Sequence, residues 1–182
     1  KDVELVYVKG SGGDLGTLRA EGLAVLQREP FLALDDVYRG VEHEDEMVGL
    51  FPHAAFGTGG ATPSIDTPMH GLVDCPHVDH LHPDSVTALA CAADGPALVQ
   101  ELWGGAVAWV PWKRPGWELG RQVSQLAQDP TVIGAVLGGH GLTSWGATSA
   151  EAQERALRII DEAAEFLARR SVPEPFGAVV PD

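Results

Sequence analysis

Two histidines separated by one residue, His80 and His82, are the clearest chemical feature of this sequence. They lie in the stretch Val78–Pro83, which reads as an extended segment. Because side chains alternate faces along a strand, both imidazoles point to the same side and can share one metal ion. The best candidate for a third ligand is His140, which follows the apolar run Val132–Leu137 among small residues. Three histidines that leave one coordination position open are typical of a catalytic metal site.

The remaining histidines lack this spacing. His70 and His77 are close to the pair in sequence but do not share its two-residue step, so we expect them at the surface or behind the ligands. His43 and His53 have no partner pattern at all. The histidine pair also has a simpler interpretation, in which the His-Pro step only ends a strand.

A second group of candidates surrounds the start of an expected helix. Residues 67–73 carry Pro68 in the first turn of that helix. The carboxylate of Asp66 and the hydroxyl of Ser64 are therefore expected near its amino end, a position that favours anions.

A glycine-rich loop, Gly10-Ser11-Gly12-Gly13, follows the first expected strand. Its glycines allow positive φ and let backbone amides face an anion. The loop is not a dinucleotide fingerprint, because the third glycine of that motif would fall on Leu15, and no Walker lysine-serine pair follows. A plain turn stays open as the alternative.

Hydrophobic periodicity predicts alternating strands and helices around these candidates. We expect strands at residues 4–8, 106–110 and 131–137, and helices at residues 85–93 and 118–128. The last helix has the clearest start, because Thr148 and Glu151 form a capping box. Residues 17–26 read as a short helix or turn. Residues 32–50 read as an exposed helix whose six acids are a solvated face or a mimic of a metal cluster.

The composition predicts one globular domain of 182 residues, 45% of them hydrophobic and 21% charged. A formal net charge of −14 argues against nucleic acid or an anionic membrane as a partner, because both bind clustered lysine and arginine. Cys75 and Cys91 lack metal-binding spacing, which fits a reducing cytoplasm. No apolar run is long enough for a membrane span, and no export signal opens the chain.

The order of these motifs connects them to a known family. The motifs are Ser64-Ile65-Asp66, His80-x-His82, Pro111-Trp112 with Pro115-Gly116-Trp117-Glu118-Leu119, and His140-Gly141-Leu142 before a long helix. This order resembles the class II aldolase/adducin family. Two stretches, Val8–Leu15 and Ser64–Gly71, more specifically resemble the aldolase module of bifunctional rhamnulose-phosphate aldolase/alcohol dehydrogenases.

The resemblance implies a three-layer αβα fold, in which a central, mostly antiparallel sheet is flanked by helices. It implies a metal-dependent aldolase that cleaves a ketose 1-phosphate, here rhamnulose 1-phosphate, to dihydroxyacetone phosphate and lactaldehyde. The residues implied for the site are the Zn²⁺ ligands His80, His82 and His140, the acid/base Asp66, and the phosphate ligands Ser11, Gly12 and Ser64. Another divalent metal could replace zinc. The family usually carries Glu where this chain has Asp66.

Two other roles of the same family remain open. One is sugar-phosphate epimerisation, which uses similar enediolate chemistry, and the other is an adducin-like assembly module without a metal site. Relatives assemble as homo-oligomers, often tetramers. We expect residues 1–171 to form the aldolase-like domain, with its N-terminal part missing, and residues 172–182 to be a Pro-rich linker or tail. The dehydrogenase module that follows in two-domain relatives is not encoded here.

Overall fold

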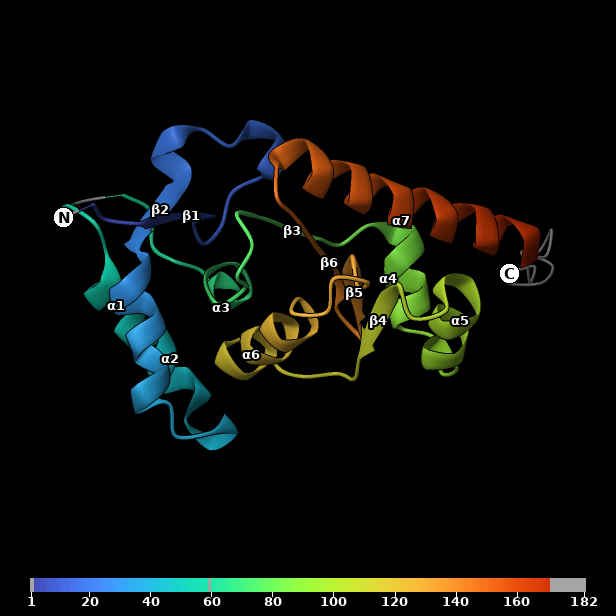
Figure 1. The fold of residues 1–182 in the computed structure, drawn as a ribbon, viewed down its shortest axis with the longest axis horizontal. Coiled ribbons are helices and arrows are strands. Elements are labelled where there is room, and N and C mark those ends of the chain that lie inside the picture. The colour runs from blue at the N-terminus through green and yellow to red at the C-terminus, as the bar shows by residue number, and fades with distance from the viewer. Residues whose placement is uncertain (1, 59, 171–182) are drawn as a thin grey trace, which may run out of the picture.

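A four-stranded sheet lies between two groups of helices in the computed structural model, which describes residues 2–58 and 60–170 (Figure 1). Its strands are β3 (His77–Leu81), β4 (Val107–Val110), β5 (Gly134–Leu137) and β6 (Gly141–Gly146). They are ordered β3-β6-β5-β4, and only the β4–β5 pair is parallel. The expectation of a mostly antiparallel central sheet flanked by helices is confirmed.

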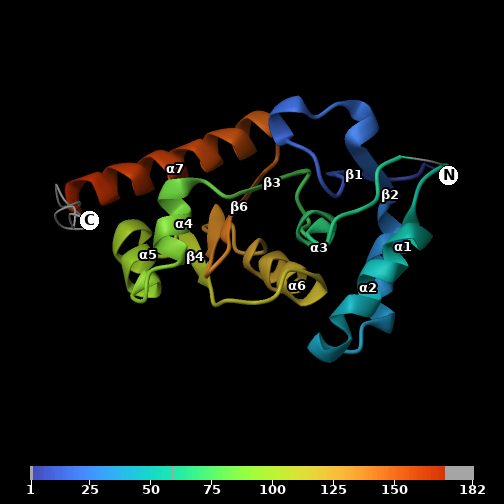
Figure 2. The ribbon, with the colours of Figure 1, turned by 180° about the vertical axis from the view of Figure 1, so that it is seen from behind.

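Each face of the sheet packs against its own helices, as Figures 1 and 2 show. One face is covered by α4 (Asp84–Ala90), α5 (Gly95–Trp103) and α7 (Ser149–Arg170), and the other by α3 (Thr67–Gly71) and α6 (Trp117–Leu126). Strand β5 contributes to both cores, because Val136 packs on the α7 side while Ala135 and Leu137 pack on the α6 side. A strand buried on both faces explains why residues 134–137 are uninterrupted by polar side chains.

The N-terminal part forms a separate antiparallel hairpin of β1 (Leu5–Lys9) and β2 (Leu23–Gln27), followed by α1 (Arg28–Leu32) and α2 (Glu44–Leu50). Its core is built around three aromatic rings, Phe31, Phe51 and Trp117, whose centroids lie 5.2 to 6.1 Å apart. Because Trp117 belongs to α6, this cluster joins the N-terminal part to the central domain.

Several sequence-based expectations for local structure were wrong. Residues 23–27 form a strand rather than a helix or turn, because Ala24 and Leu26 alternate with less buried neighbours. Residues 32–50 form short 3₁₀ turns and α2 rather than one exposed helix. One of its acids, Glu44, is only 4% exposed. Helix α5 and strand β6 were not anticipated.

The last helix begins as predicted. The backbone N–H of Glu151 donates to the Thr148 hydroxyl (3.1 Å), and the Glu151 carboxylate accepts from Ala147 N (2.7 Å). The predicted tail at residues 172–182 lies outside the described residues. None of the helices within residues 2–58 and 60–170 has an apolar stretch long enough to cross a lipid bilayer.

Candidate active site

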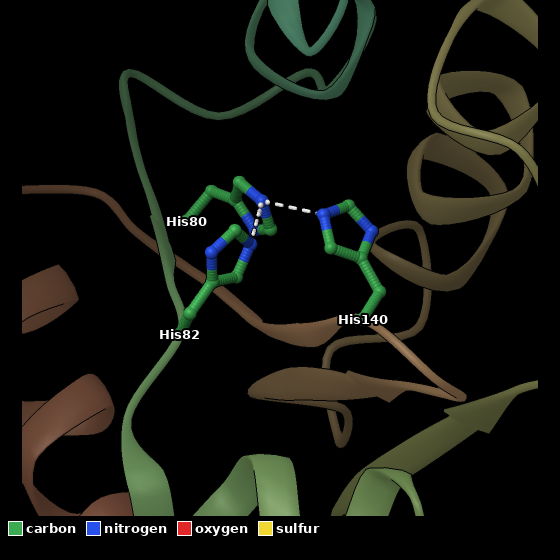
Figure 3. Close-up of side chains that lie close together, drawn as sticks. All are labelled: His80, His82 and His140. Carbon is green, nitrogen blue, oxygen red and sulfur yellow. Dashed lines mark hydrogen bonds between the residues drawn. The ribbon is translucent and has the colours of Figure 1, made fainter.

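The three histidines singled out by the sequence meet at one point, although they come from different segments (Figure 3). His80 and His82 extend from β3 and the residue after it, and His140 lies in the turn between β5 and β6. The Nε2 atom of His80 is 3.1 Å from Nε2 of His82 and 3.2 Å from Nε2 of His140. All the ligand atoms of the triad lie within 4.8 Å of one another.

Strand pairing orients the central histidine. The Nδ1 atom of His80 is 2.9 Å from the carbonyl oxygen of Leu142 on β6, so Nδ1 carries the proton and donates it. In the neutral ring, Nε2 is then left with a lone pair directed at the other two histidines. A backbone carbonyl that fixes the tautomer in this way is the usual support for a metal-binding histidine.

Glycines on both sides of His140 let its turn approach the other parts of the site. Gly139 has φ of +65°, and a Cβ at this position would lie 2.9 Å from the ring of Trp112. A Cβ at Gly141 would lie 2.5 Å from the ring of His82. The Gly-Gly-His-Gly sequence is therefore required for close packing around the triad.

The surroundings of His80 and His140 favour their uncharged forms. Burial, with a contribution from neighbouring His140, lowers the pKa of His80 to about 3. Burial also lowers the pKa of His140, while the negative charge of Asp66 opposes this shift. Neutral imidazoles are the form that binds a metal ion.

The distances from the His80 nitrogen to the other two fit a small divalent cation. Zinc–nitrogen bonds of about 2.0–2.1 Å in a tetrahedral site place the nitrogens about 3.3 Å apart. The two observed separations, 3.1 and 3.2 Å, are close to that value. A cation on the common side of the rings would also relieve the repulsion between lone pairs that face one another.

Asp66 lies beside the triad without belonging to it. It immediately precedes α3, and its backbone N–H donates to the hydroxyl of Ser64 (3.3 Å). Its Oδ1 atom is buried and has no hydrogen-bond partner among the described residues. Burial lowers the pKa of both His140 and His70, and the negative charge of Asp66 opposes this shift in each, so the carboxylate lies near both rings. A buried, unshared carboxylate oxygen is available to a ligand.

The glycine-rich loop is held beside the segment that leads to Ser64. The backbone N–H of Ser11 donates to Thr62 O (2.8 Å), and Gly10 forms a β-bridge with Pro63. The Ser11 amide is therefore engaged, whereas its side chain and Gly12 are exposed.

Two neighbouring residues were not selected from the sequence as site residues. The ammonium of Lys9 donates to Gly12 O (2.6 Å), which places a positive charge at the candidate phosphate loop. The ring of His70 donates from Nδ1 to Val78 O (3.1 Å) and thereby links α3 to β3. Lys9 directly precedes the glycines in sequence, and this adjacency was the available signal; nothing in the spacing of His70 indicated its contact.

Comparison with known proteins identifies the family. Residues 1–167 match the family described as the class II aldolase and adducin N-terminal domain. The chain belongs to this family. The class II aldolase chain is 32% identical over 179 residues to "Uncharacterized oxidoreductase YuxG" of Bacillus subtilis strain 168, a match that covers 97% of this chain and 26% of YuxG. The chain thus spans about a quarter of that relative.

Solved structures share the fold. An N-terminal class II aldolase domain from Thermoplasma acidophilum superposes with a TM-score of 0.81 at 25% identity, covering 91% of this chain and 76% of the other. An L-fuculose 1-phosphate aldolase superposes with a TM-score of 0.60 at 16% identity, covering 98% of this chain and 75% of the other. The class II aldolase domain described here therefore shares its fold with both structures.

Proposed function

We propose that this chain is a metal-dependent aldolase that cleaves a ketose 1-phosphate, with rhamnulose 1-phosphate as the substrate. The observation that carries the proposal is the convergence of three histidines beside the carboxylate of Asp66, whose Oδ1 has no partner among the described residues. A structural module would have no need of such an arrangement, because buried polar atoms without partners reduce stability.

The chemistry divides between the triad and Asp66. Zn²⁺ or another divalent ion held by His80, His82 and His140 would supply Lewis-acid polarisation of the substrate's carbonyl and hydroxyl oxygens. Asp66 takes a proton from the substrate hydroxyl when the carbon–carbon bond breaks and returns a proton to the carbon of dihydroxyacetone phosphate. Lactaldehyde is the other product.

The candidate phosphate-binding residues lie in the glycine-rich loop and in the segment just before Asp66. Ser64 lies two residues before Asp66, and the loop of Ser11 and Gly12 is held against the same segment. The hydroxyls of Ser11 and Ser64, with the Gly12 backbone, surround the phosphate, and Lys9 adds a positive charge. Because Ser11 and Gly12 lie on a different segment from Asp66, phosphate binding through them can be altered without removing the base.

The remaining proposals concern the whole protein. The domain comprises residues 1–171, with residues 172–182 as a linker, and functions in the cytoplasm as a homo-oligomer. A dehydrogenase module belongs to the same polypeptide, a proposal supported by the match to one quarter of a relative named an oxidoreductase.

A cleavage assay tests this function. The protein is stripped of metal, reconstituted with Zn²⁺, and incubated with rhamnulose 1-phosphate while dihydroxyacetone phosphate is measured. We expect metal-dependent release of dihydroxyacetone phosphate and lactaldehyde. Formation of an isomeric sugar phosphate without cleavage would support the epimerase alternative. Absence of both metal binding and turnover would leave the assembly role and contradict the proposal.

A further inference from the structure

Trp112 is an exposed aromatic side chain next to the turn that carries His140. It follows β4 by two residues and is 69% exposed, the highest exposed fraction among the large hydrophobic side chains in the described part of the chain. A single exposed hydrophobic residue is normal, whereas an apolar surface beside a few convergent polar groups is typical of a ligand site. The contacts of Trp112 decide between these two cases.

Two contacts hold the segment of Trp112 against the His140 turn. The backbone N–H of Gly138 donates to Val110 O (2.8 Å), so the parallel strands β4 and β5 end side by side. A Cβ on Gly139 would lie 2.9 Å from Cδ1 of Trp112 and 3.8 Å from its Nε1. The indole therefore meets the turn through one edge, and the turn leaves the two faces of the ring uncovered.

A cavity of about 240 Å³ lies beside the indole. Trp112 and Val41 supply its apolar surface, and Val41 is itself 58% exposed. Polar side chains complete the lining, namely Glu44, Lys113, Arg114 and Glu118. The exposed indole is thus part of a hollow that adjoins the active-site turn, and it is not an isolated surface residue.

The proposed substrate has two chemically different ends. Its phosphate end is assigned above to the hydroxyls of Ser11 and Ser64 and to the backbone of Gly12. Its other end leaves as lactaldehyde and carries a methyl group, which gains free energy by contact with apolar surface rather than with polar groups. Trp112 offers such a surface, and its edge packs on the residue before His140.

We propose that Trp112 is a specificity-determining residue, whose ring face receives the methyl end of the substrate. The inference rests on the proposed aldolase function and adds the orientation of the substrate within the site. The phosphate lies at the glycine-rich loop, the methyl group lies at the loop after β4, and the carbon–carbon bond that breaks lies between them, at the triad.

Aldol addition measures the preference for a methyl group directly. Zinc-reconstituted protein receives dihydroxyacetone phosphate with either lactaldehyde or glycolaldehyde, which lacks the methyl group, and kcat/KM is determined for each aldehyde. A methyl group in an apolar site is worth about 10- to 200-fold in discrimination, and a single open wall places the wild-type preference near the lower value. Trp112→Ala should remove most of this preference, chiefly through a higher KM for lactaldehyde.

Two control variants separate recognition from support of the turn. Trp112→Phe keeps an aromatic face without the indole N–H and should retain most of the preference for lactaldehyde. Leu157→Ala removes a comparably exposed side chain (51%) from α7 and should leave the preference at its wild-type value. If Trp112 only supported the turn, Trp112→Ala would lower kcat/KM for both aldehydes by the same factor, and the proposal would be wrong.

Acrylamide quenching gives a readout that does not depend on turnover. The Asp66→Asn variant holds the substrate without cleaving it, and the emission of Trp112 is the difference between this variant and the double variant that also carries Trp112→Phe. We expect rhamnulose 1-phosphate to reduce quenching of this emission, because the methyl end covers the ring. Inorganic phosphate, which lacks that end, should not reduce it.

An unchanged aldehyde preference in Trp112→Ala, or an indole that stays equally accessible with substrate bound, would overturn the proposal. An indole already protected without substrate would also overturn it, because a second copy of the chain would then cover Trp112. Absence of any aldol product from the wild type would contradict the proposed function and this inference together. Normal product formation with an unchanged preference would contradict this inference alone.

Discussion

Two clusters of polar side chains differ in how their hydrogen-bonding atoms are used. At Glu44, one carboxylate oxygen accepts from the Tyr38 hydroxyl (2.9 Å) and the other from the backbone N–H of Glu118 (3.2 Å). In the histidine triad, three ring nitrogens face one another, and Oδ1 of nearby Asp66 has no partner among the described residues. The first cluster is satisfied within the protein, whereas the second is complete only with a ligand.

The Glu44 cluster explains how the N-terminal part is held to the central domain. Helix α6 begins after Gly116, which has no side chain to cap it, and Glu44 accepts from Glu118 in the first turn instead. A Cβ at Gly116 would lie only 2.1 Å from the Glu44 carboxylate. Trp117 N–H donates to Asp35 (2.7 Å) nearby. This satisfied cluster therefore has a structural role.

The largest expected effect is that of replacing Asp66, the proposed base beside the histidine triad. Asp66→Asn keeps the shape of the side chain but cannot accept a proton, so cleavage should fall by about 10²- to 10⁴-fold. Metal content should stay unchanged, because the three histidines remain. Steady-state cleavage rates and metal analysis on the same sample check both statements.

Asp66→Glu is the matched control, because it restores the family's usual residue at this position. Activity is retained if the backbone lies where it does in relatives, and is lost if the extra methylene crowds the site. Near-normal turnover of Asp66→Asn would assign the proton transfer to another group.

Substitutions at Glu44 should lower the free energy of unfolding rather than the rate of cleavage. Glu44→Ala leaves the Tyr38 hydroxyl and the Glu118 amide without an acceptor and should lower the free energy of unfolding by about 2–3 kcal/mol. Urea unfolding of the metal-free protein measures this change. Glu44→Gln, which can still accept from one donor, should lose less. Loss of metal from either variant below its unfolding midpoint would contradict the separation of the two clusters.

The sequence predicted the grouping of the three histidines better than it predicted the strands and helices around them. The two-residue spacing on a strand was sufficient to place His80 and His82 together, and the small residues around His140 made it the best candidate for the third ligand. Strand β6 was not predicted, and its polar residues Thr143 and Ser144 interrupt an apolar pattern although both are fully buried. Strands depend on pairing with distant segments, which periodicity along the chain does not encode.

Glu44 shows that a local sequence pattern can also fail to predict the burial of a charged residue. It stands among neighbouring acids, and a run of acids predicts a solvated helix face. Its burial depends on the amide of Glu118, 74 residues later, which no local pattern reveals. The candidate phosphate residues Ser11, Gly12 and Ser64 came from resemblance to the family and stay predictions.

Burial of His80 should make the free energy of unfolding depend on pH in the acid range. In the metal-free protein, unfolded His80 takes up a proton near pH 6.5, whereas the folded residue does so only near pH 3. Between these values the unfolded state binds one more proton, so stability should fall as pH falls, by about 1.4 kcal/mol per pH unit from this residue. Urea unfolding between pH 4 and 6 should show a shallower dependence for His80→Gln than for His77→Gln. Equal slopes would show that His80 is not buried in its neutral form.

The smallest effect is expected from an ion pair outside both clusters. Arg114 and Asp45 form a hydrogen-bonded pair at the surface, where both side chains are more than half exposed. Solvent screening makes such pairs weak, so Arg114→Ala should leave the urea midpoint and the cleavage rate unchanged within error. A clear loss of stability would mean that the connection to the N-terminal part depends on this pair as well as on Glu44.

Metal stoichiometry measures the central claim most directly. Wild-type protein and the variants His80→Ala, His82→Ala, His140→Ala and His77→Ala are dialysed against equal free Zn²⁺ and analysed by mass spectrometry for bound metal. The account predicts one ion per chain for wild type and His77→Ala, and loss of most bound metal in each of the three triad variants, with an affinity loss beyond about 100-fold. Full retention of metal by the triad variants, or equal loss from His77→Ala, would contradict it.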